Sequence, residues 1–157
     1  MEKEWLAAFS RMTYGIYVLT AAFEDKINGM IASWVSQVSY DPPVIIAAVH
    51  PGRYSHELIK KSKCFALHVI SRDQKDFLKR FKGPDPAAKF TDIEWIKGKT
   101  GSPVINDCSA WFECEVINSF APGNHTVFIG QVVNAKNLSS SDVMSTADYE
   151  GVYIGKS

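Results

Sequence analysis

The sequence lacks the features that mark several large classes of protein. Its three cysteines, Cys64, Cys108 and Cys114, are an odd set without CxxC spacing, which argues against a disulfide framework, a zinc site and a cysteine-ligated iron site. Lys plus Arg and Asp plus Glu both number 17, and this neutrality argues against a surface for nucleic acid or anionic membranes. No apolar run reaches the roughly 18 residues of a spanning helix, and the charged start MEKEW carries no apolar signal region. We therefore expect a soluble, cytoplasmic protein.

The sequence also lacks the short motifs of well-known catalytic sites. GxSxG, HExxH, a Walker loop and GxGxxG after a first strand are all absent. The four histidines, His50, His56, His68 and His125, have no metal-ligand spacing, and we expect His56 and His68 to serve ordinary packing. Any reaction is therefore expected to depend on a bound cofactor.

Strand patterns dominate what is present. With 157 residues, of which 46% are hydrophobic, the sequence can build the core of one domain, which we expect to cover residues 1–157. Stretches that alternate polar and apolar residues, or are rich in β-branched and aromatic ones, predict about seven strands. These strands lie at residues 14–23, 28–39, 44–49, 64–70, 93–97, 110–119 and 126–136. So many strands in a short chain predict a closed barrel, because closure removes exposed edges. Cys64 and Cys114 fall inside strand patterns and are expected to be buried.

Three short helices are predicted beside the strands, at residues 2–11, 55–62 and 71–81. Ser55 is expected to cap the second helix, with Leu58 and Ile59 facing inward, and Ser71 with Gln74 is expected to form a capping box before the third. Residues 82–88 contain glycine and prolines and predict an exposed loop. The polar residues from Ser139 onward predict a tail that lies on the surface.

Residues 28–43, NGMIASWVSQVSYDPP, form the most informative stretch. Small and hydroxyl-bearing side chains let a flat ligand approach the backbone closely, Asn28 offers directional hydrogen bonds, and Trp34 can cover a ring. Composition alone favours a second interpretation, in which the small residues only allow tight packing.

Several consecutive runs carry a family resemblance. The first three runs are MTYGIYVLTA at residues 12–21, NGMIASWVSQVSYDPPVIIAAV at residues 28–49 and HPGRYSHELIKKS at residues 50–62. The later runs are FKGPDPAAKF, GSPVINDCSAWFECEV and GNHTVFIGQVVNA. In order and spacing this series resembles the flavin reductase-like family. Because of Trp34, the resemblance is closest to flavoredoxin and to the flavin domain of high-molecular-weight rubredoxins.

The resemblance implies a mainly β fold, an FMN-binding split β-barrel with a few short helices, and it assigns no metal and no protein acid or base. It implies that residues 28–34 line the isoalloxazine, that residues 53–55 bind the phosphate at a helix start, that Lys89 ahead of Phe90 adds a second charge, and that His125 reaches the flavin from a hairpin. The implied cofactor-binding residues are Asn28, Gly29, Met30, Ile31, Ala32, Ser33, Trp34, Arg53, Tyr54, Ser55, Lys89, Phe90 and His125. For Arg53 and Lys89 a solvated surface charge is the alternative, and for His125 a role in packing.

The function implied by this resemblance is that of an FMN-dependent oxidoreductase that works as a homodimer. NAD(P)H or a protein donor passes hydride or electrons through bound flavin to an acceptor, which is a flavin, iron or a redox protein. The alternative is a flavoredoxin-like electron carrier without reductase activity of its own, with rubredoxin or ferredoxin as partner. No rubredoxin-like module occurs in the sequence, so we expect any iron-containing partner to be a separate protein. A barrel that binds nucleic acid is opposed by the neutral charge.

Overall fold

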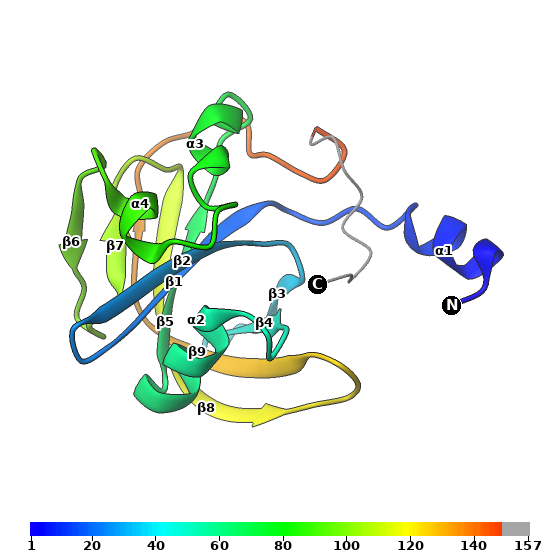
Figure 1. The fold of residues 1–157 in the computed structure, drawn as a ribbon, viewed down its shortest axis with the longest axis horizontal. Coiled ribbons are helices and arrows are strands. Elements are labelled where there is room, and N and C mark those ends of the chain that lie inside the picture. Colours follow the sequence, from blue (N-terminus) through cyan, green and yellow to red (C-terminus); the bar gives the residue numbers. More distant parts are fainter. Residues whose placement is uncertain (149–157) are drawn as a thin grey trace.

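The computed structural model describes residues 1–148 and is built around one antiparallel sheet of seven strands (Figure 1). The strand order is β2-β1-β5-β8-β9-β4-β3, and two short strands, β6 and β7, form a second sheet. The strands are β1 (Tyr17–Phe23), β2 (Lys26–Ala32), β3 (Val35–Ser39), β4 (Val44–Val49), β5 (Cys64–Val69), β6 (Trp95–Lys97), β7 (Pro103–Ile105), β8 (Ala110–Phe120) and β9 (Thr126–Asn137). The helices are α1 (Lys3–Phe9), α2 (Tyr54–Ser62), α3 (Lys75–Lys79) and α4 (Pro86–Phe90). The predicted mainly β fold with a few short helices is confirmed.

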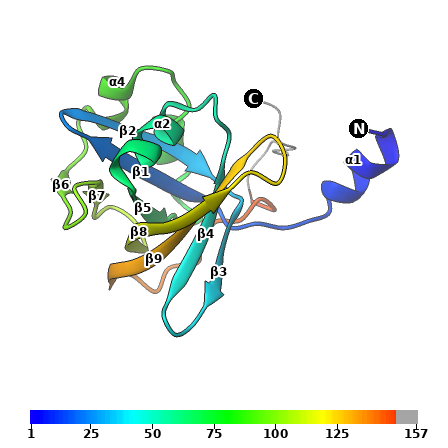
Figure 2. The ribbon, with the colours of Figure 1, turned by 90° about the horizontal axis from the view of Figure 1, so that it is seen from below.

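The single strand predicted at residues 28–39 is wrong, because two strands occupy this stretch. β2 pairs with β1, whereas β3 pairs with β4 at the opposite end of the strand order. Only Ser33 and Trp34 separate them, and the chain turns sharply there, since the Val35 amide donates to the Ser33 carbonyl at 3.0 Å. Figure 2 shows the chain passing from the end of β2 directly into β3. The two edges of the sheet therefore meet at this two-residue link.

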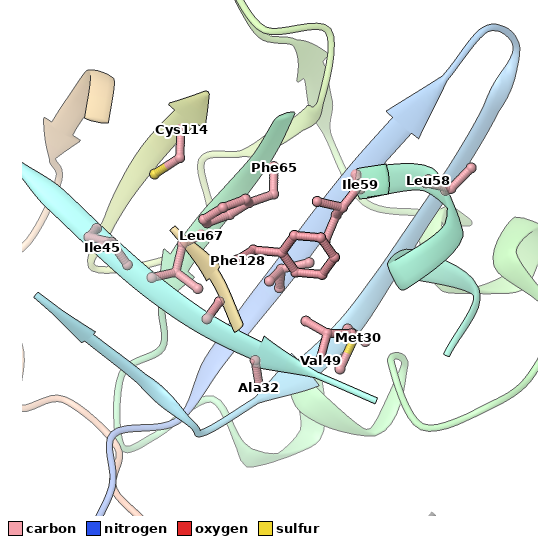
Figure 3. Packing of buried hydrophobic residues seen from close by; sticks show 13 residues of the cluster. Met30, Ala32, Ile45, Val49, Leu58, Ile59, Phe65, Leu67, Cys114 and Phe128 are labelled. Atoms are coloured by element: carbon pink, nitrogen blue, oxygen red, sulfur yellow. The ribbon is translucent and has the colours of Figure 1, made fainter. Parts of the chain in front are cut away.

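The interior of the sheet holds a hydrophobic cluster to which most of its strands contribute (Figure 3). Leu19, Phe65 and Phe128 are at most 2% exposed there. α2 covers the cluster with Leu58 and Ile59, as predicted. Its N-cap is Arg53 rather than Ser55, because the helix begins at Tyr54 and the Ser55 hydroxyl has another partner.

A second cluster lies on the other face of β1 and β5, and it corrects the predicted surface tail. Met144 is 1% exposed within this cluster. Its amide donates to the Ile70 carbonyl at 2.8 Å, and its carbonyl accepts from the Ile16 amide at 3.0 Å. Met144 therefore anchors residues 139–148 to the barrel through its burial and two backbone hydrogen bonds. The polar composition of this segment gives no sign of this contact. The rest of the predicted tail, residues 149–157, lies outside the described residues.

The segment between β5 and β8 also differs from prediction. α3 begins at Lys75, and only half of the predicted capping box forms, with the Ser71 amide donating to Gln74 Oε1 at 3.0 Å. The predicted loop 82–88 contains the start of α4, where Asp85 accepts from the Ala87 amide at 3.0 Å ahead of a proline in the first turn. Asp-Pro is a helix-start signal that the loop composition concealed. β7 was not predicted either, which leaves nine strands and four helices within residues 1–148 instead of seven and three.

β8 departs from strict alternation. Its register with β9 shifts between Glu113 and Cys114, so both consecutive side chains are buried, at 1% and 0% exposure. The predicted burial of Cys114 is confirmed, whereas Cys64 is only half-buried. No helix within residues 1–148 is long and apolar enough to cross a membrane.

Candidate functional site

Three polar side chains from distant parts of the sequence meet beside the first half of β2. Asn28 of β2 donates through Nδ2 to Ser55 Oγ of α2 at 2.9 Å. Lys89 of α4 donates through Nζ to Asn28 Oδ1 at 3.0 Å and to the Gly29 carbonyl at 2.9 Å. All three residues are buried, and we refer to Asn28, Ser55 and Lys89 as the polar cradle.

Lys89 brings a positive charge into the cradle that the described chain does not neutralise. Both of its acceptors are neutral oxygens, and no salt bridge involves it among residues 1–148. Burial, and next the charge of Arg53, lower the pKa of Lys89, while Asp85 acts in the opposite direction. A buried cation without a counter-ion is costly, and an anion beside it removes that cost.

The first turn of α2 adds to this positive potential. Arg53 is the N-cap of the helix and is exposed, so its guanidinium can reach a ligand. The first amides of a helix lack intrahelical partners and carry the positive end of the helix dipole. Phosphate suits such a position, and the polar cradle with Arg53 therefore fits a phosphate group.

A cluster of rings lies next to the link between β2 and β3. The Trp34 and His125 ring centroids are 4.7 Å apart, and those of His50 and His125 are 5.2 Å apart in an edge-to-face arrangement. His125 Nδ1 is 2.8 Å from Asn124 Oδ1. Burial, followed by the charges of His50 and Arg53, lowers the pKa of His125, so its imidazole is neutral near pH 7. This ring corner, formed by Trp34, His50 and His125, offers aromatic surface to a planar ligand.

The remaining predicted residues of β2 are divided between the two faces of the strand. Met30 and Ala32 are buried in the barrel cluster, whereas Ile31 packs against the second cluster. Gly29 accommodates Phe81, because a Cβ there would lie 2.7 Å from Phe81 Cε1. The side chains of these β2 residues serve packing, so a ligand can bind only to the backbone groups of this part of the strand. β2 ends the strand order, so among the described residues its outer edge pairs with no strand.

The structure thus brings together Asn28, Ser55, Lys89 and Arg53 at one end of the candidate site, and Trp34 and His125 at the other. Ser33 is buried in the link between the two ends. Tyr54 is half-buried against the barrel cluster, and Phe90 packs against the rings of Phe81 and Trp95.

Two histidines of the HPGRYSH run border this site without having been predicted as part of it. His50 Nδ1 accepts from the Gly52 amide at 3.0 Å and so shapes the turn that leads to Arg53. His56 is buried, with Nε2 2.8 Å from Thr126 Oγ1, and burial is the main reason that its pKa is lowered. Their position on either side of a predicted phosphate-binding arginine was the available signal. The packing predicted for His56 and His68 is confirmed. The His56 ring centroid is 5.3 Å from that of Phe128, and His68 is fully buried and bonded to backbone on both ring nitrogens.

Comparisons with known proteins agree on one family. A family model described as flavin reductase like domain matches residues 9–153. The ferric-chelate reductase (NAD(P)H) of Archaeoglobus fulgidus is 30% identical over 153 residues, which cover 95% of this chain and 90% of that protein. The high molecular weight rubredoxin of Moorella thermoacetica is 31% identical over 152 residues, which cover 94% of this chain and 66% of that protein.

Solved structures match the same fold. The NADH:FAD oxidoreductase SgcE6 of Streptomyces globisporus, solved with NAD and FAD fragments, aligns with a TM-score of 0.80 and 25% identity, over 88% of this chain and 83% of that one. The barrel described above is therefore a flavin reductase split barrel.

Proposed function

The chain belongs to the flavin reductase-like family of flavoprotein oxidoreductases, and from this premise we propose that it binds FMN and passes electrons through it from NAD(P)H to an acceptor. The observation that carries the proposal is Lys89, a buried cation bonded only to neutral oxygens, next to Arg53 and the first turn of α2. One phosphate group supplies the missing negative charge.

Each end of the site has its own task in this proposal. The polar cradle and Arg53 hold the phosphate, and the outer edge of β2 presents backbone groups to the polar edge of the isoalloxazine. Trp34 and His125 pack against the ring system and keep water from one side of it. Bound flavin would supply an acceptor of hydride that also releases electrons one at a time, so the chain need only position it and leave one face open to a donor.

The flavin content of the purified protein tests the proposal directly. We expect yellow protein that releases FMN on denaturation, identified by chromatography of the supernatant. Protein that is purified without colour and takes up neither FMN nor FAD when they are added would refute it.

A second candidate function is that of an electron carrier with little reductase activity. It is favoured by the similarity to the high molecular weight rubredoxin, of which this chain spans about two thirds. In this case a separate rubredoxin or ferredoxin would exchange electrons with the flavin. Anaerobic stopped-flow mixing separates the two functions: rapid bleaching of the flavin by NADH or NADPH, with repeated turnover, supports the reductase, whereas rapid bleaching only by a reduced iron protein supports the carrier.

We also propose that the chain forms a homodimer, with residues 1–157 as one flavin-binding domain in the cytoplasm. Large apolar side chains are exposed on β8 and β9, among them Ile117, Phe120 and Val133, and Val38 is exposed on β3. Such residues favour contact with a second copy. Light scattering that shows only monomer for the flavin-loaded protein would refute the dimer.

A further inference from the structure

The loop and the first turn of α2 on either side of Arg53 contact the β8–β9 hairpin at two points. At one point the His50 ring meets the His125 ring edge to face, with centroids 5.2 Å apart. At the other point His56 Nε2 lies 2.8 Å from Thr126 Oγ1. His125 and Thr126 are consecutive in the sequence, so the segment that carries Arg53 is joined twice to the hairpin that carries His125.

The contact between His56 and Thr126 is embedded in the fold. His56 is 8% exposed, and its ring packs against Phe128 of the barrel cluster. Thr126 begins β9 and pairs with Val49, the last residue of β4. Because one partner is buried in α2 and the other is fixed in the sheet, their hydrogen bond holds the first turn of α2 against the beginning of β9.

This hydrogen bond connects the two ends of the candidate site. His56 follows Ser55 of the polar cradle, and Thr126 follows His125 of the ring corner. Burial is the main reason that the pKa values of both His56 and His125 are lowered, so both imidazoles are neutral near pH 7. A nitrogen of a neutral imidazole either donates to a hydroxyl or accepts from it, so the bond forms in both tautomers of His56. A displacement of the hairpin would break this bond and move His125 away from the cradle.

We infer that His56 and Thr126 are positioning residues for the flavin site, because their hydrogen bond holds the His125 imidazole at a fixed distance from the polar cradle. The inference rests on the proposed function, since a bound flavin would contact both ends of the site at once. In this role His56 and Thr126 act through their neighbours rather than by contact with the flavin. Loss of the bond should let the hairpin move outward, which exposes His125 to water and separates it from the charges of His50 and Arg53.

NMR titration of the histidine side chains in the flavin-free protein tests this inference, with His125→Gln to identify the signals of His125. Thr126→Val keeps the shape of the side chain but removes the hydroxyl. We expect it to raise the pKa of His125 towards its ordinary value of 6.5, because burial and the charges of His50 and Arg53 are what lower this pKa. Thr126→Ser keeps the hydroxyl and should retain the wild-type pKa. FMN affinity should fall about fivefold in Thr126→Val, as expected for one neutral hydrogen bond, and should be retained in Thr126→Ser.

Two further variants separate positioning from a general loss of stability. Thr100→Val is the matched control, because it removes a hydroxyl hydrogen bond of the same length, 2.8 Å, to Glu113 in the body of the barrel. It should leave the pKa of His125 and the affinity for FMN unchanged. His56→Phe should shift the pKa of His125 as Thr126→Val does, and the double variant should shift it no further, since each substitution removes the same bond.

Other results would overturn the inference. They are a pKa of His125 that does not change in Thr126→Val, an equal change in Thr126→Ser, or additive changes in the double variant. An equal change in Thr100→Val would overturn it as well, because the pKa would then follow stability alone. If the wild-type protein binds neither FMN nor FAD, the proposed function fails, whereas the pKa of His125 still decides whether the bond positions this residue.

Discussion

Buried ionisable groups have different partners in the body of the barrel and in the candidate flavin site. In the body, the Glu113 carboxylate accepts from the Thr100 amide at 2.9 Å, from the Thr100 hydroxyl at 2.8 Å and from Asn134 Nδ2 at 2.9 Å. Burial raises the pKa of Glu113, but these hydrogen bonds outweigh burial and the pKa is lowered. His68 is also saturated, because its Nδ1 is 2.9 Å from the Val18 carbonyl and its Nε2 accepts from the Ile105 amide at 3.0 Å.

Lys89 in the site is the opposite case. Lys89 is also buried, yet its hydrogen-bond partners are neutral, and burial lowers its pKa more than the charge of Asp85 raises it. A buried group whose hydrogen bonds are all made within the chain stabilises the fold. A buried charge that the chain does not compensate instead stabilises the complex with a ligand of opposite charge. Substitutions in the two regions should therefore change different measured quantities.

The largest effect is expected from acid titration of His68. Burial lowers the pKa of this imidazole from 6.5 to about 4. Between these values the unfolded chain binds the additional proton, so the free energy of unfolding should fall as the pH falls from 6.5 towards 4, by about 3 kcal/mol in total. Urea unfolding followed by circular dichroism at several pH values measures this slope.

His68→Gln is the control for that titration, since it keeps a donor and an acceptor but does not titrate. The variant should have a flatter pH dependence between pH 6.5 and 4, whatever its stability at pH 7. A slope equal to that of the wild-type protein would mean that other groups, such as His56 or His125, produce the loss.

Glu113→Gln tests the body of the barrel in a second way. The variant replaces an acceptor-only carboxylate with an amide that brings two donors into a position surrounded by donors, so we expect a loss of about 2 kcal/mol in the free energy of unfolding. Flavin affinity should remain within twofold of the wild-type value. A loss of flavin affinity with unchanged stability would contradict the assignment of Glu113 to the fold.

Lys89→Met should show the reverse pattern. Removal of the buried charge should leave the unfolding free energy of the flavin-free protein unchanged or slightly increased. Loss of charge-assisted hydrogen bonds to phosphate should weaken FMN by about 30-fold, which corresponds to about 2 kcal/mol. Titration of FMN fluorescence measures the affinity, and thermal unfolding of the apoprotein measures the stability. If Lys89→Met destabilises the apoprotein as Glu113→Gln does, the distinction between the two regions is lost.

The smallest effect is expected at the ring corner. Trp34→Ala should weaken FMN by about fivefold, since an aromatic contact contributes about 1 kcal/mol beyond area burial. The flavin absorption spectrum should shift as well. Trp5→Ala is a suitable control, because Trp5 is 57% exposed on α1, away from the site. An unchanged spectrum and affinity would assign Trp34 to packing alone.

The sequence predicted the pattern of strands well because burial on one or both faces leaves a clear periodicity. It failed where a tertiary contact decides the local structure. The turn at Ser33 and Trp34 leaves no periodic signal, and it depends on β3 finding β4 at the far edge of the sheet. The register shift next to Glu113 also leaves no periodic signal, and the carboxylate buried there is bonded to Thr100 and Asn134, which are distant in the sequence.

For the site, the residues with distinctive chemistry could be predicted, but their arrangement could not. Asn28, Ser55 and Lys89 were all expected at the flavin, yet the hydrogen bond from Lys89 to Asn28 depends on α4, whose first residues were predicted as loop. Met30 and Ala32 belong to the matching run but face the core, because alternate residues of a strand point to opposite sides. Sequence resemblance therefore predicts which strand lies at the flavin, but not which of its side chains face the flavin and which face the core.

The two-residue link at Ser33 and Trp34 has a consequence for the thermodynamics of the protein in the cell. Since the two edges of the sheet meet at this link, a flavin bound beside it, as proposed, would hold both edges together and would bind to the folded form in preference to the unfolded chain. Mass action then couples flavin supply to folding, and a free ligand concentration of 100 times the Kd adds about 2.7 kcal/mol to the free energy of unfolding. A cell short of flavin would therefore hold a less heat-resistant form of the protein.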